Sequence, residues 1–500
     1  MRITPMRHLL VIGLVVAAAP LVAGAGTAGP GSAGIGDRLF PLLGNGGYDV
    51  GAYDLRLTYP EKDPAQTVRG DVSITATATQ QLSQFNLDFA GGGPSRVDVN
   101  GKSATFVRDG DELVVTPQSY LRKGRAFTVT VHGFTAVPED PDPNAPDGFT
   151  TTPDGTALLG QPAAAHRLFP SNDHPSDKAA YTITTNVPQG WTGTASGVLA
   201  STRSADGRVV STYRHPQPMA SELLQVVAGD FVVHERAPVG GVRVRDVVPR
   251  RLATEALPRF DVEREQISWL TGQVGPYPFD VYGSLLIDVE LGAALETQTL
   301  SVYDSSIVAL PRPVLESIEA HELAHHWFGN SVAPAEWSDV WLNEGHATWY
   351  ELLWAEKIGA VEEHTGSPTR EEFFKRVYAV SDTWRAQFGP VARPTSAAQL
   401  FDLFNSNVYY GGALALYALE QEIGTPAFQR LERAWPSVNR GRSASTDDFI
   451  TLASQVAGRD LKPFLTAWLY GTTTPPMPGH PDWTTSPSAR SLHVPGSLRH

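Results

Sequence analysis

The sequence contains no cysteine among its 500 residues. This absence excludes a disulfide scaffold, an iron–sulfur cluster, a zinc site held by thiolates and a cysteine nucleophile. Any metal must therefore be held by histidine, aspartate or glutamate. The 46 glycines and 39 prolines together stay below the roughly 25–30% of a composition that indicates disorder. We therefore expect a folded protein.

Charge is also scarce. Charged residues make up 18% of the chain, compared with about 25% in typical globular domains. The net charge of −14 at pH 7 disfavours polyanionic partners, so we expect no binding to nucleic acid. The length predicts two or three domains, because single hydrophobic cores rarely grow past about 250–300 residues.

Long apolar runs are absent beyond the N-terminus, and no later stretch reaches the roughly 20 apolar residues of a spanning helix. The chain starts with the basic segment MRITPMRH, followed by the apolar run LLVIGLVVAAAPLVAGA, which ends at Ala25. This layout is typical of a secretory signal peptide. A membrane anchor is the alternative, but the run is short, contains Pro20 and ends in small residues. We predict a signal peptide over 1–25 cleaved near Ala25, a secreted protein and no stable membrane insertion.

The pattern of the remaining chain predicts two folded domains. Residues 26–45 are mostly small and predict a flexible linker. Residues 46–240 contain short alternating runs such as YDLRLTY and YTITTNV, separated by turn residues, which predict an all-β domain built on an antiparallel sheet or saddle. Residues 241–475 contain few strand patterns and many helical periods, which predict an α+β, mostly helical domain. Residues 476–500 have little to pack and predict a loose tail.

The candidate chemistry lies in the segment PVLESIEAHELAHHWFGN, which predicts a helix over 313–328. His321 and His325 are four residues apart on one helix face, so both imidazoles can reach one Zn²⁺ at about 2.0–2.1 Å. Glu322 can lean over the open coordination position and accept a proton from water there. The alternative is an exposed helix that carries these residues by chance. Neighbouring apolar residues argue against it, since burying two histidines and a glutamate without a partner would be costly.

A third ligand is available in the segment WSDVWLNEGHATWY, where eighteen residues separate Glu344 from His325. Glu344 is expected to begin a second helix, with Ser338 or Asp339 as its cap. A neighbouring antiparallel helix could present this carboxylate to the metal. The sequence therefore predicts one Zn²⁺ per chain, held by two histidines and a glutamate with one position left for water.

Together, HELAHHWFGN and WLNEGHATW closely resemble the gluzincin aminopeptidases of the aminopeptidase N and leukotriene hydrolase family. The resemblance extends to the segments at 160–182, 275–288 and 408–419 and spans nearly the whole chain. It implies an N-terminal β domain followed by a thermolysin-like catalytic domain. The family's further C-terminal helical domain has no counterpart here, so we expect a short, two-domain, secreted bacterial form.

The resemblance also implies residue roles. The zinc ligands of the family match His321, His325 and Glu344, and its general base matches Glu322. Its transition-state tyrosine lies in a Tyr-x-Lys/Arg-Gly context, which makes Tyr409 the candidate. Because glycine replaces the basic residue here, Tyr410 remains the alternative, as does a packing role for both tyrosines.

In the family, the glutamate of a Gly-x-Met-Glu-Asn strand holds the free α-amino group of the substrate. Glu296 matches this glutamate, whereas Ala293, Leu295 and Thr297 replace the glycine, methionine and asparagine. These departures leave the preferred N-terminal residue open. Gln161 matches a position that lines the pocket for the N-terminal side chain.

The resemblance therefore implies a secreted zinc aminopeptidase that acts on peptides with a free N-terminus. The alternatives are a zinc endopeptidase, an epoxide hydrolase on the same scaffold, or an inactive binding protein. The sequence does not determine the oligomeric state. Two further histidines are expected to serve structure: His326, next to the metal ligands or at the surface, and His346, as a packing residue. Asp173 and His174 are expected to serve a loop or a domain interface.

Overall fold

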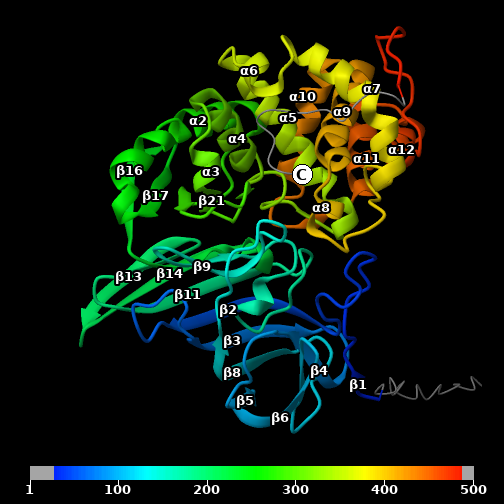
Figure 1. Ribbon diagram of the computed structural model, residues 1–500. Coiled ribbons are helices and arrows are strands. Elements are labelled where there is room, and N and C mark those ends of the chain that lie inside the picture. Colours follow the sequence, from blue (N-terminus) through cyan, green and yellow to red (C-terminus); the bar gives the residue numbers. More distant parts are fainter. Residues whose placement is uncertain (1–26, 487–500) are drawn as a thin grey trace, which may run out of the picture.

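A β-rich N-terminal part and a helical C-terminal part lie one above the other in the computed structural model (Figure 1), which describes residues 27–486. The predicted signal peptide lies outside the described residues. The expected fold class, a β domain followed by a mostly helical domain, is confirmed. No helix among residues 27–486 combines the length and the apolar character that a bilayer span requires.

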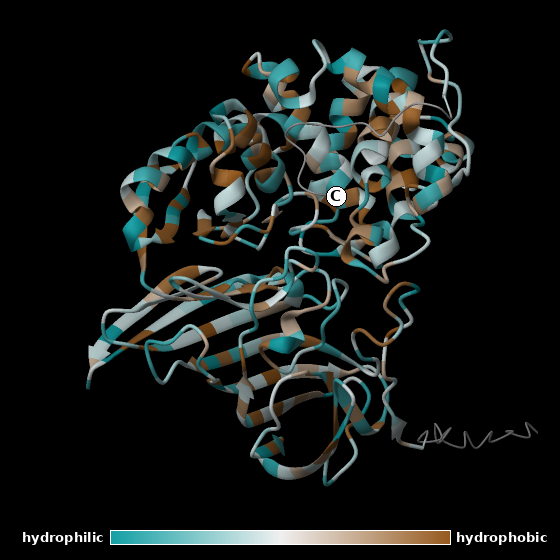
Figure 2. Ribbon diagram, viewed as in Figure 1, coloured by the Kyte–Doolittle hydropathy of each residue, from teal (hydrophilic) through white to brown (hydrophobic). Residues whose placement is uncertain are grey.

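The β domain is built on an eleven-stranded sheet in the order β1-β4-β7-β6-β5-β8-β3-β2-β11-β14-β13. Buried and exposed residues alternate along β2 and β3, because successive side chains of a strand point to opposite faces. In Figure 2, brown bands of hydrophobic residues alternate with paler or teal bands along the strands of this sheet. Its strands are β1 (Gly29–Pro30), β2 (Tyr48–Thr58), β3 (Val68–Ala78), β4 (Leu82–Asp88), β5 (Arg96–Val99), β6 (Lys102–Asp109), β7 (Glu112–Thr116), β8 (Ala126–Ala136), β11 (Ala179–Pro188), β13 (Val198–Ala205) and β14 (Arg208–Met219).

The sheet is antiparallel at most of its pairings, as predicted. Two pairings differ: β1 runs parallel to β4, and β2 runs parallel to β11. The second arises because the chain leaves β2, builds the first half of the sheet and returns to the other edge of β2.

A second, four-stranded sheet in the order β12-β15-β10-β9 belongs to the same domain. Its strands are β9 (Gly148–Thr152), β10 (Gly155–Leu159), β12 (Thr192–Ala195) and β15 (Val226–Gly229). Strand β10 ends two residues before Gln161, so this sheet determines where Gln161 lies.

The predicted domain boundary at residue 240 is wrong. Strand β16 (Phe231–Val239) pairs antiparallel with β17 (Val242–Pro249) in the sheet of the catalytic domain, whose order is β16-β17-β19-β21-β20. The other strands of this sheet are β18 (Val281–Tyr282), β19 (Ser284–Ile287), β20 (Ala294–Leu295) and β21 (Ser301–Asp304). The boundary therefore lies near Asp230, which separates β15 of the four-stranded sheet from β16 of the catalytic-domain sheet.

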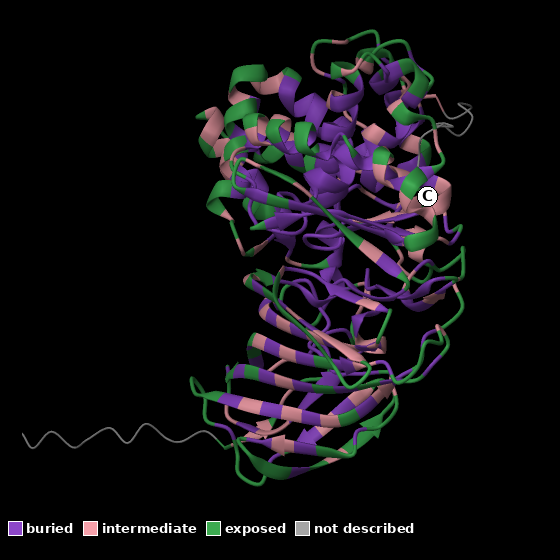
Figure 3. Ribbon diagram, turned by 90° about the vertical axis from the view of Figure 1, so that its left-hand side faces the viewer, coloured by how far each residue is buried: buried purple, intermediate pink, exposed green. Residues whose placement is uncertain are grey.

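Helices form most of the remaining domain, and most of their large apolar residues are buried in a common core, as the purple segments of Figure 3 show. The central helix α5 packs against both α4 and α9. The helices are α1 (Ala253–Ala256), α2 (Glu263–Val274), α3 (Ser305–Val308), α4 (Arg312–Ala324), α5 (Trp341–Lys357), α6 (Val361–Thr365), α7 (Arg370–Phe388), α8 (Leu400–Leu403), α9 (Ser406–Ile423), α10 (Thr425–Val438), α11 (Thr446–Ala457) and α12 (Lys462–Tyr470), with a small ribbon of β22 (Ala333–Pro334) and β23 (Ser443–Ala444).

The segment predicted as a flexible linker is instead anchored to both domains. Gly29 and Pro30 form β1, which pairs with β4. Asp37 is 3% exposed. Its Oδ2 accepts a hydrogen bond from the Trp337 backbone N–H at 2.7 Å and lies 3.2 Å from His174 Nε2. These buried polar contacts hold the segment in place. The small-residue composition that predicted a linker does not indicate them.

The start of the predicted loose tail is also packed. Met477 and Trp483 are buried in the helical core, and the Trp483 ring stacks on Tyr417 with 6.0 Å between the ring centres. Burial of these two large side chains stabilises the segment. Its sequence is rich in proline and shows no helical or strand period, so this packing could not be predicted. The prediction of a loose tail is therefore wrong as far as residue 486, and the rest of the tail lies outside the described residues.

Candidate metal centre

Helices α4 and α5 bring the three predicted metal ligands together. His321 lies in the last turn of α4, and His325 follows its end with helical backbone angles of φ −54° and ψ −27°. Glu344 lies in the first turn of α5. One ligand atom from each of the three residues lies within 4.8 Å of the other two. The Nε2 atoms of both histidines lie 3.3 Å from Glu344 Oε2.

The start of α5 differs from the prediction. Ser338 and Asp339 belong to a short 3₁₀ helix, Trp337–Asp339, which runs directly into α5. Val340 is the cap residue and makes no side-chain capping bond. The extended residue before this 3₁₀ turn is Glu336, so neither Ser338 nor Asp339 is in position to cap α5. Asp339 instead accepts hydrogen bonds from the N–H and the hydroxyl of Thr446.

The donor set and its electrostatics fit Zn²⁺. Two imidazoles and one carboxylate are ligands that zinc prefers, and all three side chains are buried. Burial alone would raise the pKa of Glu344, but His325 and His321 outweigh it and lower the pKa to about 2. Burial alone would lower the pKa of His325, but Glu296 and Glu344 raise it to about 9. The imidazoles and the Glu344 carboxylate thus stabilise each other's charges, and a divalent cation would take the place of the imidazole protons.

A second layer of hydrogen bonds orients the two imidazoles. His321 donates from Nδ1 to Glu351 Oε2 at 2.8 Å, and His364 donates from Nε2 to Glu351 Oε1 at 2.5 Å. His325 donates from Nδ1 to the Phe328 carbonyl at 3.1 Å. Both rings are therefore held with Nε2 towards the metal position. Sequence reasoning missed Glu351 and His364, although Glu351 lies on the same face of α5 as Glu344.

Glu322 lies beside the metal position. Its carboxylate, the carboxylate of Glu296 and a ring nitrogen of His325 lie within 4.8 Å of one another. Glu322 Oε2 is buried and has no hydrogen-bond partner among residues 27–486. Burial raises the pKa of this carboxyl to about 8, although both histidines counteract the shift. The free oxygen beside the metal position lets this carboxyl group take a proton from a water molecule there and return it.

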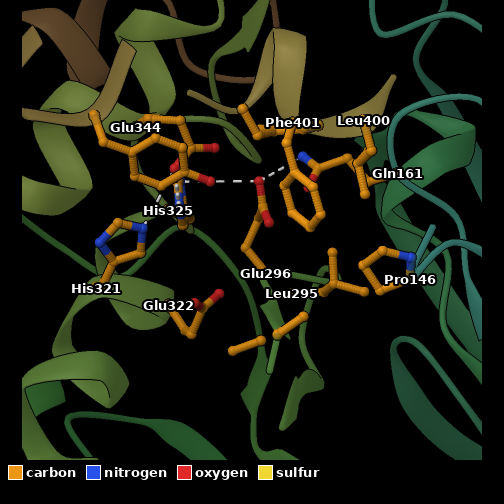
Figure 4. A pocket seen from close by; sticks show the side chains of 14 residues that line it. Pro146, Gln161, Leu295, Glu296, His321, Glu322, His325, Glu344, Leu400 and Phe401 are labelled. Atoms are coloured by element: carbon orange, nitrogen blue, oxygen red, sulfur yellow. Dashed lines mark hydrogen bonds and ion pairs between the residues drawn. The ribbon is translucent and has the colours of Figure 1, made fainter. Parts of the chain in front are cut away.

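Glu296 and Gln161 meet across the domain interface. Gln161, from the β domain, donates from Nε2 to Glu296 Oε1 at 2.7 Å (Figure 4). Asn330 donates from Nδ2 to the Glu296 backbone carbonyl at 2.7 Å. The sequence had not singled out Asn330. The two predicted substrate-binding residues thus line one pocket together with the metal ligands.

The two candidate tyrosines occupy different surroundings. Tyr409 lines the pocket, and its ring stacks on His321 with 5.9 Å between centres. Tyr410 packs on Phe373 and Trp384, on the helical side of the core. Burial raises the pKa of Tyr409 well above its usual value, and the nearby carboxylates of Glu344, Glu296 and Glu322 raise it further. The Tyr409 phenol is therefore protonated at neutral pH and able to donate a hydrogen bond.

A close approach of two glycines brings Tyr409 to the metal position. Gly345 of α5 meets Gly412 of α9, and a Cβ on Gly345 would lie 2.9 Å from the Gly412 carbonyl carbon. The two helices can therefore touch backbone to backbone only because neither residue carries a side chain.

The remaining wall of the pocket is apolar. It consists of Pro146 from a β-domain loop, Ala293, Ala294 and Leu295 around β20, and Leu400, Phe401 and Phe404 in and after α8. Phe401, Leu295 and Pro146 lie on the side of Glu296 away from the metal ligands (Figure 4). This part of the pocket offers a neutral side chain a dry environment.

Comparison with known proteins places these features in a family. The Peptidase family M1 domain matches residues 259–468. The chain is 26% identical over 450 residues to Aminopeptidase M1-A of Oryza sativa subsp. japonica, which covers 83% of this chain and 49% of that protein. It is also 26% identical to Aminopeptidase N of Streptomyces lividans, over 61% of this chain and 36% of that protein. The chain thus spans about half or less of the length of these curated relatives.

A solved structure of similar length decides the assignment. The crystal structure of an M1 zinc metallopeptidase from Deinococcus radiodurans matches with a TM-score of 0.77 and 30% identity, covering 89% of this chain and 99% of that one. The chain belongs to peptidase family M1. The family predicted from HELAHHWFGN and WLNEGHATW is therefore confirmed, and so is Zn²⁺ as the metal that His321, His325 and Glu344 fit.

The other singled-out residues of this M1 peptidase are structural. His326 is fully buried, accepts a hydrogen bond from the Thr299 N–H at 3.1 Å and donates to the Glu322 carbonyl at 3.2 Å. It therefore lies next to the metal centre rather than at the surface. His346 stacks on Phe328 with 4.5 Å between centres, as expected of a packing residue.

Proposed function

We propose that this M1 peptidase is a secreted zinc aminopeptidase that removes single residues from the free N-termini of peptides. The observation that carries the proposal is the position of Glu296. Its carboxylate lies within 4.8 Å of ligand atoms of Glu322 and His325, so an ammonium group paired with Glu296 brings the first peptide bond next to the metal centre. The relatives named aminopeptidases support the same activity.

The proposed reaction divides among the metal ligands, Glu322 and Tyr409. Zn²⁺ held by His321, His325 and Glu344 would polarise the scissile carbonyl and make water at the site more acidic. Glu322 accepts a proton from the attacking water as the new carbon–oxygen bond forms. It then passes this proton to the amine nitrogen as the carbon–nitrogen bond breaks. The phenol of Tyr409 donates a hydrogen bond to the negative oxygen that develops in the transition state.

The proposal is tested with aminoacyl arylamides that carry either a free or an acetylated α-amino group. We expect hydrolysis of the free-amino substrates, almost none of the acetylated ones, and none after treatment with a chelator. Leucyl and phenylalanyl substrates should be preferred over glutamyl ones, because the pocket wall is apolar and Glu296 and Glu322 repel a further carboxylate. Equal hydrolysis of free and acetylated substrates would instead favour an endopeptidase, and hydrolysis of epoxides alone would favour the third candidate activity.

Secretion rests on the sequence of residues 1–25, with its basic start, apolar run and small residues before Ala25. We expect the protein to accumulate in the culture medium of an expressing bacterium with Gly26 as its first residue. Mass spectrometry of the N-terminal peptide measures this directly. Retention of the uncleaved N-terminus in the membrane fraction would show a membrane anchor instead.

A further inference from the structure

A buried carboxylate outside the metal centre holds the loop that leads to Glu296. Asp304, the last residue of β21, is 1% exposed. Its Oδ2 accepts hydrogen bonds from the backbone N–H groups of Leu291 at 2.6 Å and Ala293 at 3.2 Å, and also from that of Gly292 between them. Its Oδ1 accepts from the Ser306 hydroxyl at 2.7 Å and the Ile307 N–H at 2.9 Å. One oxygen thus serves the loop, and the other serves the start of α3.

The loop 291–293 continues directly into the floor of the substrate pocket. Strand β20 follows at once and pairs antiparallel with β21, with Ala294 opposite Tyr303 and Leu295 opposite Val302. Residues 293–296 all line the pocket, ending in Glu296. Strand β20 is also the last in the order of its sheet. The short β20 ladder and Asp304 therefore hold the backbone that leads into Glu296. Gln161 holds the Glu296 carboxylate, and Asn330 holds the Glu296 backbone carbonyl.

The geometry of the loop makes the carboxylate necessary. Gly292 has a left-handed backbone with φ +71°. Three successive N–H groups around it converge on one point and form a concave site that favours an anion. Hydrogen bonds from N–H groups to an ionised carboxylate are about twice as strong as neutral ones. Asp304 fills this concavity from inside the protein and so fixes the loop in one conformation.

We propose that Asp304 is a positioning residue that sets the affinity of the pocket for the free α-amino group of the substrate. It acts through the loop 291–293 and Glu296 and does not touch the reacting atoms. This inference rests on the proposed aminopeptidase function, because it concerns the group that Glu296 binds.

The test is Asp304→Asn, which keeps the shape of the side chain, removes its charge and leaves one acceptor oxygen where two now serve the loop and α3. We expect KM for a leucyl arylamide to rise about tenfold with kcat nearly unchanged, since binding common to ground and transition states is lost. Inhibition by leucinamide should weaken by a similar factor, whereas inhibition by 4-methylpentanamide, which lacks the amine, should stay unchanged. Bound zinc should remain stoichiometric.

Two further variants separate positioning from folding. Ser306→Ala removes a bond to Oδ1 and leaves the three bonds of Oδ2 intact, so its KM should equal that of the wild type. Gly292→Ala strains the same loop without changing the carboxylate, and it should reproduce the rise in KM even if Asp304→Asn does not fold.

Distinct results would overturn the inference. One is a folded Asp304→Asn or Gly292→Ala protein with the wild-type preference for leucinamide over 4-methylpentanamide. Another is equal weakening of both inhibitors together with loss of zinc, which would indicate a general structural role. If the wild-type protein hydrolyses no free-amino substrate, the proposed function fails, and the inhibitor comparison by calorimetry still tests whether Asp304 governs amine binding.

Discussion

The Glu322→Gln variant is expected to lose turnover while keeping its metal. Glutamine has the shape of glutamate but cannot accept a proton from water, and general acid–base catalysis is worth about 10²–10⁴-fold in rate. We expect kcat for a free-amino arylamide to fall by about 10³-fold or more. Zinc measured by atomic absorption should remain at one per chain, because His321, His325 and Glu344 are unchanged.

Glu319 offers a matched control on the same helix. It is fully buried and does not line the pocket, and burial raises its pKa well above the usual range. Glutamine keeps the size of this buried side chain, and Glu319 lies outside the pocket wall, so Glu319→Gln should change activity little. Near-normal activity of Glu322→Gln, or an equal loss in both variants, would contradict the assignment of Glu322 as the proton acceptor.

The Tyr409→Phe variant is expected to show the second largest loss. Its phenol is buried, protonated and next to the metal ligands. A donor that stabilises only the transition state contributes about 10²–10³-fold to kcat, by analogy with the removal of other oxyanion donors. KM should change little, because the substrate carbonyl gains most from the hydroxyl once it becomes negatively charged.

Tyr410→Phe is the natural comparison for this measurement. The two residues are adjacent in α9, but Tyr410 packs on Phe373 and Trp384 and is absent from the pocket wall. Its loss of a hydroxyl should leave kcat within a few-fold of the wild type. A larger loss of kcat in Tyr410→Phe than in Tyr409→Phe would show that Tyr410, and not Tyr409, is the transition-state tyrosine.

The local part of the site could be predicted from the sequence. His321 and His325 meet because residues four apart share a helix face, which depends only on the helical repeat. Helix α4 itself ends at Ala324, earlier than the predicted residue 328. The turn of helical backbone that continues through His325 keeps the spacing, so the error in the boundary does not affect the ligands. Glu344 followed from a second motif and from the family resemblance.

Contacts between distant segments could not be predicted in the same way. Asp37 meets Trp337 and His174 across long stretches of chain, and the Glu351–His364 pair joins two helices. Each of these contacts depends on one polar side chain, and the sequence around that side chain has no hydrophobic period that would indicate its partner. The domain boundary failed for a related reason, since β15 and β16 follow each other as one apolar run although they belong to different sheets.

The contact between Gly345 and Gly412 has a consequence for how this enzyme can change over evolution. At this contact the atoms nearest to a Cβ on Gly345 are all backbone atoms of Gly412 and Ala413, so a side chain on either glycine would push the two helices apart. Glu344 lies at one side of this contact and Tyr409 at the other. The distance between the metal position and the Tyr409 phenol therefore depends on these two glycines, whereas the apolar wall formed by Pro146, Leu400 and Phe401 belongs to other segments of the chain.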